Sequence, residues 1–121
     1  MVATRTATRS PKTTLRPARD ARILLVTAPQ AAARSLADEL VGARLAACVS
    51  VLRGVRSVYR WKGKVERATE ALLVIKAPAR SVRALVARLV KAHPYEVPEC
   101  LVLRPEAGLL SYLDWIQEAA R

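Results

Sequence analysis

The side chains best suited to metal chemistry lie in one short segment near the end of the chain. His93 is the only imidazole in the sequence, and Glu96 and Glu99 follow it closely. Imidazole nitrogen and carboxylate oxygen can together bind a borderline divalent ion such as copper. Pro94 and Pro98 restrict the segment, which lowers the entropy lost when a ligand is bound. The segment is therefore a candidate cation site.

A structural role for the same histidine stays open. His93 follows Leu89 and Val90 at helical spacing, at the end of an apolar stripe. There the ring would pack and donate a hydrogen bond to a backbone carbonyl. If the ring binds metal instead, a neighbouring subunit could complete the ligand set. The two glutamates have a similar alternative, because they could be solvated side chains beside a rigid turn.

The two cysteines are the other soft ligands, and we expect them to be buried, reduced thiols. Cys48 and Cys100 lie in apolar runs without the paired spacing of a zinc site. With one histidine, a single chain cannot supply the four Cys and His ligands of a structural zinc centre. Cys48 remains a weak candidate ligand for a divalent cation.

Four aromatic residues are candidates for a subunit cleft or interface. Tyr59, Trp61 and Tyr95 could line a cleft, and Trp115 lies near the end of the chain. Packing at an interface is the commoner role of aromatic residues on strands. On the strand that carries Tyr59 and Trp61, the Arg and Lys side chains at positions of the opposite parity are expected to face water, although they could bind an anion.

Hydrophobic periodicity along the chain predicts seven elements that must position these residues. They are strand 22–27, a helix from Pro29 to about 45, strand 46–62, strand 65–76, a helix capped by Ser81, strand 97–103, and a helix opened by a Ser111–Asp114 capping box and ending near 119. This order predicts an α+β, ferredoxin-like (split βαβ) antiparallel sheet with an extra C-terminal helix. Cys48 and Cys100 would then lie at opposite edges of the sheet, too far apart for a disulfide.

The two middle strands form a hairpin that is too long for the body of such a domain. Residues 46–62 would span about 56 Å at ~3.3 Å per residue, whereas a domain of about 100 residues has a radius of gyration near 13 Å. Gly63, between two lysines, favours a hairpin tip, and Gly54 indicates a bulge or bend. The hairpin either bends within a monomer or projects and pairs with neighbours in a symmetric oligomer, which we favour.

Composition predicts one domain and a basic tail. The chain has 121 residues, 52% of them hydrophobic, with 21 Lys and Arg against 10 Asp and Glu, a net charge of +11. Residues 1–20 have almost no large apolar side chains, so we expect a flexible basic N-terminal tail before a domain at 21–121. No apolar run reaches the ~20 residues of a membrane span. The expected location is the cytoplasm, or an organelle if residues 1–20 act as a transit peptide.

The residues also bear on two other classes of function, an RNA-binding module and an enzyme. The segment from Arg53 to Tyr59 superficially resembles an RNA-binding motif, but Val55 and Ser57 occupy positions that require stacking aromatics. An RNA- or anion-binding module is thus the alternative function, and nucleic acid is not the expected partner. The sequence has no Ser/His/Asp set, Gly-rich phosphate loop or paired-His zinc motif, so we do not expect an enzyme.

Five segments carry a resemblance to a known family. They are Val26-Thr-Ala-Pro29, Arg44-Leu-Ala-Ala-Cys-Val49, Gly54-Val-Arg-Ser-Val-Tyr-Arg-Trp61 with Gly63, His93-Pro-Tyr-Glu-Val-Pro-Glu99, and Tyr112-Leu-Asp-Trp-Ile116. In this order they closely resemble the CutA divalent-cation tolerance family, from about Ile23 to the end.

The resemblance implies a ferredoxin-like homotrimer, similar in plan to the PII signalling proteins. It also implies a non-enzymatic role in copper or other divalent-cation tolerance and in the response to metal ions, with metal ions and further copies of the chain as partners. Some members proposed to bind copper have a Cys before the Thr-Ala-Pro segment and a second His directly before the residue that corresponds to His93. Val26 and Ala92 stand at those positions here, which weakens the transfer of a copper site.

Overall fold

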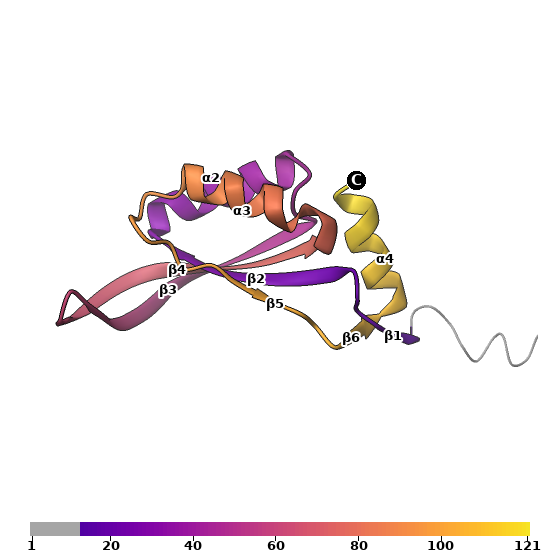
Figure 1. Cartoon of the computed structure of the whole chain (residues 1–121), viewed down its shortest axis with the longest axis horizontal. Helices are drawn as coiled ribbons and strands as arrows, with labels where there is room; N and C mark the ends of the chain where they lie inside the picture. The colour runs from indigo at the N-terminus through magenta and orange to yellow at the C-terminus, as the bar shows by residue number, and fades with distance from the viewer. Residues whose placement is uncertain (1–12) are drawn as a thin grey trace, which may run out of the picture.

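A computed structural model describes residues 13–121 of the chain. Its elements are β1 (Leu15–Pro17), β2 (Ala21–Ala28), α2 (Gln30–Gly42), β3 (Cys48–Trp61), β4 (Lys64–Pro78), the 3-10 turn η1 (Ala79–Ser81), α3 (Val82–Ala92), β5 (Leu101–Leu103), β6 (Ala107–Leu109) and α4 (Leu110–Ala119). Four strands form an antiparallel sheet in the order β3-β4-β2-β5, and β1 pairs with β6. Figure 1 shows α2 and α3 over one face of the sheet and α4 at one end. This is the predicted ferredoxin-like α+β fold.

The core lies between the sheet and the layer formed by α2 and α3. On the sheet, Leu24 pairs with Ile75 and Val26 pairs with Leu73, and all four side chains are fully buried. The helices bury most of the apolar stripes expected from the sequence, although Val90 of the α3 stripe is exposed. The buried members include Leu36, Leu40, Leu85 and Leu89. Burying one such side chain contributes about 1.5–3 kcal/mol relative to leaving it exposed. Alternate residues of β2 and β4 therefore lie under the helices and are the buried ones, as the two-residue period of a strand requires.

The opposite face of the sheet is apolar but only partly covered. Leu25 pairs with Val74 on this face, and both are half-buried. Helix α4 covers one end of the face, where Ala21 packs against Leu113 and Ile116. The rest of the face has no helix over it within residues 13–121 (Figure 1).

The hairpin of β3 and β4 extends well beyond the helices, as Figure 1 shows. We call residues 55–70 the arm. The arm begins at a β-bulge between Leu52 and Val55, where Gly54 has φ 72° and donates its N–H to Gln30 Oε1 at 2.6 Å. At the tip, Lys62 and Gly63 both have positive φ, 50° and 80°, which is the geometry of a type I′ turn. The predicted bulge and tip are both confirmed.

The predicted boundary of the tail is wrong in one part. Leu15–Pro17, which fall in the segment expected to be flexible, form β1 and pair with Ala107–Leu109. Arg16 also bonds to Asp114 at 2.9 Å, and Ala18 is buried in the cluster under α4. These contacts come from residues about 90 positions away, so local composition did not reveal them. Residues 1–12 of the predicted tail lie outside the described residues.

Several predicted boundaries also need correction. The last core strand covers Leu101–Leu103 rather than 97–103, because the two prolines of the preceding segment hold it in a loop. Ser81 makes no side-chain cap to α3. Ser111 lies inside α4, which begins at Leu110. The capping box does not form, and the Asp114 carboxylate pairs with Arg16 instead.

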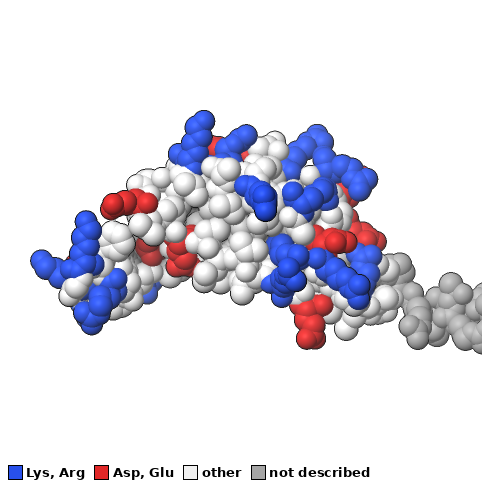
Figure 2. All heavy atoms as spheres, in the orientation of Figure 1, with Lys and Arg blue, Asp and Glu red and all other residues white. Residues whose placement is uncertain are grey.

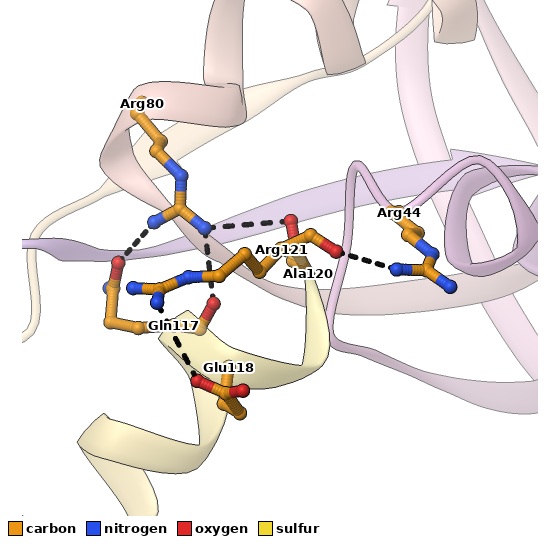
Figure 3. A network of polar contacts seen from close by, with 6 residues as sticks. All are labelled: Arg44, Arg80, Gln117, Glu118, Ala120 and Arg121. Carbon is orange, nitrogen blue, oxygen red and sulfur yellow. Dashed lines mark hydrogen bonds and ion pairs between the residues drawn. The ribbon is translucent and has the colours of Figure 1, made fainter.

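Arginine side chains hold the end of α4 against the body (Figure 3). The Arg80 guanidinium donates to the side-chain and backbone oxygens of Gln117 and, at 3.5 Å, to the carbonyl of Ala120. Arg44 donates to the carbonyl of Arg121 at 2.8 Å. The last carbonyls of a helix lack partners within the helix, and positive groups there are favourable.

Among the described residues, no helix is long and apolar enough to cross a membrane.

Candidate functional site

A cleft of about 690 Å³ lies between the arm and the loop that follows α3. The arm contributes Tyr59 and Trp61, and the loop contributes Tyr95, Glu96 and Glu99. Five residues singled out from the sequence are thus brought together at one place. They come from segments more than 30 positions apart, and the strand parity of Tyr59 and Trp61 places both on the cleft side of the arm.

His93 lies behind the cleft and uses both of its ring nitrogens. The ring is 7% exposed, Nε2 lies 2.8 Å from the Thr27 carbonyl, and Nδ1 lies 3.1 Å from the Tyr95 amide nitrogen. Because the amide can only donate, Nδ1 must accept and Nε2 must carry the proton. This is the structural role that the sequence left open. A metal could bind this ring only after one of the two hydrogen bonds is broken.

Tyr95 connects the loop to the base of the arm. Its hydroxyl donates to Glu70 Oε1 at 2.7 Å, and its ring lies 4.9 Å from the His93 ring, centroid to centroid. Burial raises the pKa of Tyr95 to about 12, with further contributions from the hydrogen bond to Glu70, the charge of Glu70 and the nearby Tyr59. The phenol therefore stays protonated and continues to donate to the carboxylate.

Glu70 is a site residue that the sequence analysis did not predict. Its side chain is only 6% exposed, although it belongs to a strand that is mostly exposed in the arm. It directly precedes the apolar run from Ala71 to Ile75. A carboxylate at the start of a buried run needs a hydrogen-bond partner. The position of Glu70 directly before this apolar run was therefore the feature of the sequence from which a buried, hydrogen-bonded carboxylate could have been predicted.

The remaining candidate ligands are not gathered around one point. Thr27 Oγ1 lies 3.4 Å from Glu99 Oε1, and Glu96 lines the cleft separately. Cys48 lies at the end of β3 that is remote from the arm and pairs across the ladder with Lys76. Within residues 13–121, no group of three or more His, Cys, Asp and Glu side chains is placed to hold a metal ion.

The two cysteines are free and lie where the topology predicted. Cys48 is on β3 and Cys100 directly precedes β5, the two edge strands of the sheet. Burial, and secondarily the charge of Glu99, raise the pKa of the Cys100 thiol. Both side chains are half-buried rather than fully buried as expected, because the edge strands lack a neighbour on one side within the described chain.

The fourth aromatic candidate lies apart from the cleft. Trp115 stacks on Tyr112 of α4, with ring centroids 5.6 Å apart and an interplanar angle of 23°. Both rings are exposed, by 45% and 42%. Trp115 is thus placed on a separate apolar surface at the α4 end of the molecule.

The cleft is acidic although the chain as a whole is strongly basic. Its charged lining consists of Glu70, Glu96 and Glu99, and no Lys or Arg of residues 13–121 lines it. Figure 2 shows acidic atoms between the basic tip of the arm and the basic surface of the body. The arrangement is suited to attract a cation into the angle between the arm and the loop.

The split-βαβ sheet, the projecting hairpin and the terminal helix define a ferredoxin-like protein. More specifically, the chain belongs to the CutA1 divalent ion tolerance protein family, whose model matches residues 22–119. The divalent-cation tolerance protein CutA of Pectobacterium atrosepticum is 44% identical over 107 residues, which cover 88% of this chain and 97% of that protein. The CutA of Thermus thermophilus is 41% identical over 97 residues, covering 79% and 94%.

A solved structure agrees with this assignment. The structure of CutA from Synechococcus elongatus PCC7942 superposes with a TM-score of 0.88 at 38% identity, covering 93% of this chain and all of that chain. The sequence resemblance to the CutA family is therefore confirmed by both sequence and structure comparisons.

Proposed function

We propose that this protein acts in divalent-cation tolerance as a non-enzymatic, metal-responsive homotrimer. Family membership over residues 22–119 is the observation that carries the proposal, together with relatives named for divalent-cation tolerance at 41% and 44% identity. We place the protein in the cytoplasm and expect a signalling role similar in plan to that of PII proteins.

The exposed apolar surface supports assembly. Leu52, Leu101 and Leu103 belong to the two edge strands and are 42–58% exposed, and Val58 on the arm is 64% exposed. Unpaired edge strands and apolar arms favour pairing with another chain. In a closed ring of three copies, each arm would extend along the sheet of its neighbour and cover this surface.

Light scattering tests the assembly directly. The expected mass is three times the 13.2 kDa of one chain. A Leu101→Asp/Leu103→Asp variant should shift the mass to that of a monomer, because two charges would be buried at the interface. Val90→Asp is the matched control, since Val90 is 53% exposed on α3. A monomeric wild-type protein at micromolar concentration would contradict the trimer.

For the cation itself, we propose Glu96 and Glu99 as the first contacts and copper as the first ion to test. Both carboxylates line the cleft, and the hydrogen bond that Glu99 accepts from Thr27 is long, at 3.4 Å. A role for His93 requires release of its ring, and Cys48 would take part only in a separate contact, because it lies at the remote end of β3. We expect weak binding, since no three candidate ligands of residues 13–121 converge.

Calorimetric titration with Cu²⁺ separates these contributions. Glu96→Gln/Glu99→Gln should remove most of the heat of binding, whereas Glu118→Gln on α4 should not change it. Unchanged isotherms in the double variant would remove the carboxylates from the site. In His93→Ala, an isotherm identical to that of the wild type would remove the imidazole.

Growth measurements test the function. In a bacterial strain that lacks its own CutA-family gene, expression of this chain should raise the Cu²⁺ concentration that halves the growth rate. The Leu101→Asp/Leu103→Asp variant should restore less growth at the same protein level. No change in that concentration, with the wild-type protein present and folded, would contradict the proposal.

A further inference from the structure

A second cavity, of about 320 Å³, lies between helix α4 and the segment that joins β1 to β2. We propose that it binds a small zwitterion, namely an α-amino acid with an aliphatic side chain. Six of its lining residues, 16–21, precede the part of the chain matched by the family model, which begins at residue 22. The inference therefore goes beyond the proposed function and concerns a segment on which that function does not depend.

The cavity lies at the end of the molecule opposite to the arm (Figure 1). Helix α4 contributes Leu113 and Gln117, which are four positions apart and share one face of the helix. Trp115, the candidate interface residue, is two positions from each of them and therefore lies on the opposite side of α4. The lining also contains no residue of the arm or of the edge strands β3 and β5. The cavity is thus separate from every surface that the proposed trimer would cover.

Two side chains of opposite sign are available to a ligand in this cavity. Within residues 13–121, the Arg19 guanidinium and the Asp20 carboxylate have no hydrogen bond or ion pair, and both side chains are exposed. Arg16 is the other cation of the lining, and Asp114 already neutralises it at 2.9 Å. A ligand carboxylate can form two parallel hydrogen bonds to the free guanidinium. An ammonium on the same ligand can then pair with Asp20.

A ligand with only one charge fits this lining less well. An anion without a positive group would be repelled by Asp20, and a cation without a negative group would be repelled by Arg19.

The rest of the lining is apolar and suits an aliphatic side chain. Ala18, Ala21 and Leu113 are buried around the cavity, and Pro17 completes this part of the wall. A volume of about 320 Å³ is at the lower end of the usual range for small-molecule sites, roughly 300–1,000 Å³. The cavity is therefore of a size for one amino acid rather than for a larger cofactor.

The backbone that carries the two free charges is fixed in the absence of a ligand. The Asp20 carbonyl accepts hydrogen bonds from the Ala79 N–H at 2.7 Å and from Gln117 Nε2 at 2.8 Å. The Arg19 carbonyl accepts one from the Arg22 guanidinium at 2.7 Å. A preformed site loses less conformational entropy when a ligand binds. Only the two side chains have to become ordered.

NMR spectra of the backbone amides test the site, with the full chain and L-leucine as the probe. We expect saturable shifts of the amide signals of Ala18, Ala21 and Gln117, with a dissociation constant on the order of 1 mM. Arg19→Gln and Asp20→Asn should each weaken binding about tenfold, because each removes one charge-assisted contact. Both variants keep the backbone carbonyls that hold the segment, so the fold should be unchanged.

Matched ligands and matched variants serve as controls. Isopentylamine and isocaproate keep the aliphatic chain of leucine but have one charged group each, and neither should saturate the site at about 10 mM, tenfold above the expected constant for leucine. Arg83→Gln and Asp38→Asn change exposed charges on α3 and α2 that do not line the cavity, and they should leave the affinity unchanged.

Three outcomes would overturn the proposal. They are the absence of saturation with L-leucine up to about 10 mM, equally tight binding of either single-charge analogue, and equal weakening by the control variants. Because the measurement involves no copper and no growth assay, its failure leaves the proposed function intact, and the reverse also holds.

Discussion

The body and the arm are built from the same two strands, yet they differ in what stabilises them. In the body, Leu73 and Ile75 of β4 are fully buried under the helices. In the arm, Val58 and Val65 are exposed by 64% and 50% on the same β3–β4 ladder. Backbone pairing continues through both regions. The comparison shows that the ladder can extend a hairpin, whereas hydrophobic burial stabilises only the half that the helices cover.

The largest expected effect comes from truncating one apolar side chain in each region. Leu73→Ala should lower the free energy of unfolding by about 2–5 kcal/mol, because the buried site would be left with a cavity. Val65→Ala should change it by no more than about 0.5 kcal/mol in the dissociated protein. Urea unfolding at low protein concentration measures both. A loss in Val65→Ala close to that in Leu73→Ala would mean that the arm is buried in the assembled protein.

A substitution at the base of the arm, where the arm meets the body, should lower the free energy of unfolding by a smaller amount. Tyr95→Phe removes the donor to Glu70 and leaves a buried carboxylate without its partner. The expected loss is about 1.5–3 kcal/mol in the free energy of unfolding. Tyr112→Phe is the matched control, because the Tyr112 ring is exposed and its stacking on Trp115 is retained. Equal losses in the two variants would show that the Tyr95–Glu70 bond does not connect the loop to the arm.

The tip of the arm should be sensitive to backbone conformation rather than to burial. Gly63 has φ 80°, so Gly63→Ala should cost about 1 kcal/mol even though no atom lies within 4 Å of the added Cβ. Gly42 at the end of α2 has equal space and no positive φ, and Gly42→Ala should be neutral or slightly stabilising. Thermal unfolding of the two variants compares them. A neutral Gly63→Ala would mean that the tip adopts another turn in solution.

The last expected effect is a dependence of stability on alkaline pH, which leaves the protein unaffected at neutral pH. The folded-state pKa of Tyr95 is about 12, above its ordinary value of 10.0, so folding favours the protonated phenol. The resulting stabilisation is fully present below pH 10 and is lost as the pH rises through 12. Absorbance titration of wild type and Tyr95→Phe should show that the missing tyrosine ionises near pH 12. Ionisation of that residue near pH 10 would contradict the described environment.

Local sequence patterns predicted most of the fold. The apolar runs in β2 and β4, the spacing in α2 and α3, and the glycines at 54 and 63 each specify a local conformation, and the structure has all of them. The pairing of β1 with β6 could not be predicted in this way, because it depends on residues about 90 positions apart. For the same reason, Asp114 bonds to Arg16 rather than forming the expected capping box.

The candidate site was predicted in its residue types but not in its organisation. The long hairpin was predicted, and Tyr59, Trp61 and Tyr95 were grouped as residues of a cleft between subunits, whereas the structure places all three around a cleft within one chain. Glu70 was not predicted, because its burial depends on a tyrosine 25 positions away. The roles of the two His93 nitrogens depend on the carbonyl of Thr27 in β2 and on the backbone amide of Tyr95. No pattern of residue types encodes either of these contacts.

The hydrogen bond from the Gly54 amide to Gln30 has a mechanical consequence for the hairpin. A bulge is normally a place where a strand can flex, since its extra amide has no partner in the ladder. Here that amide is held at 2.6 Å by a side chain from the first turn of α2. The bulge is therefore held against the first turn of α2. A force applied at the tip of the arm would be transmitted to α2 before it widened the cleft beside Tyr95.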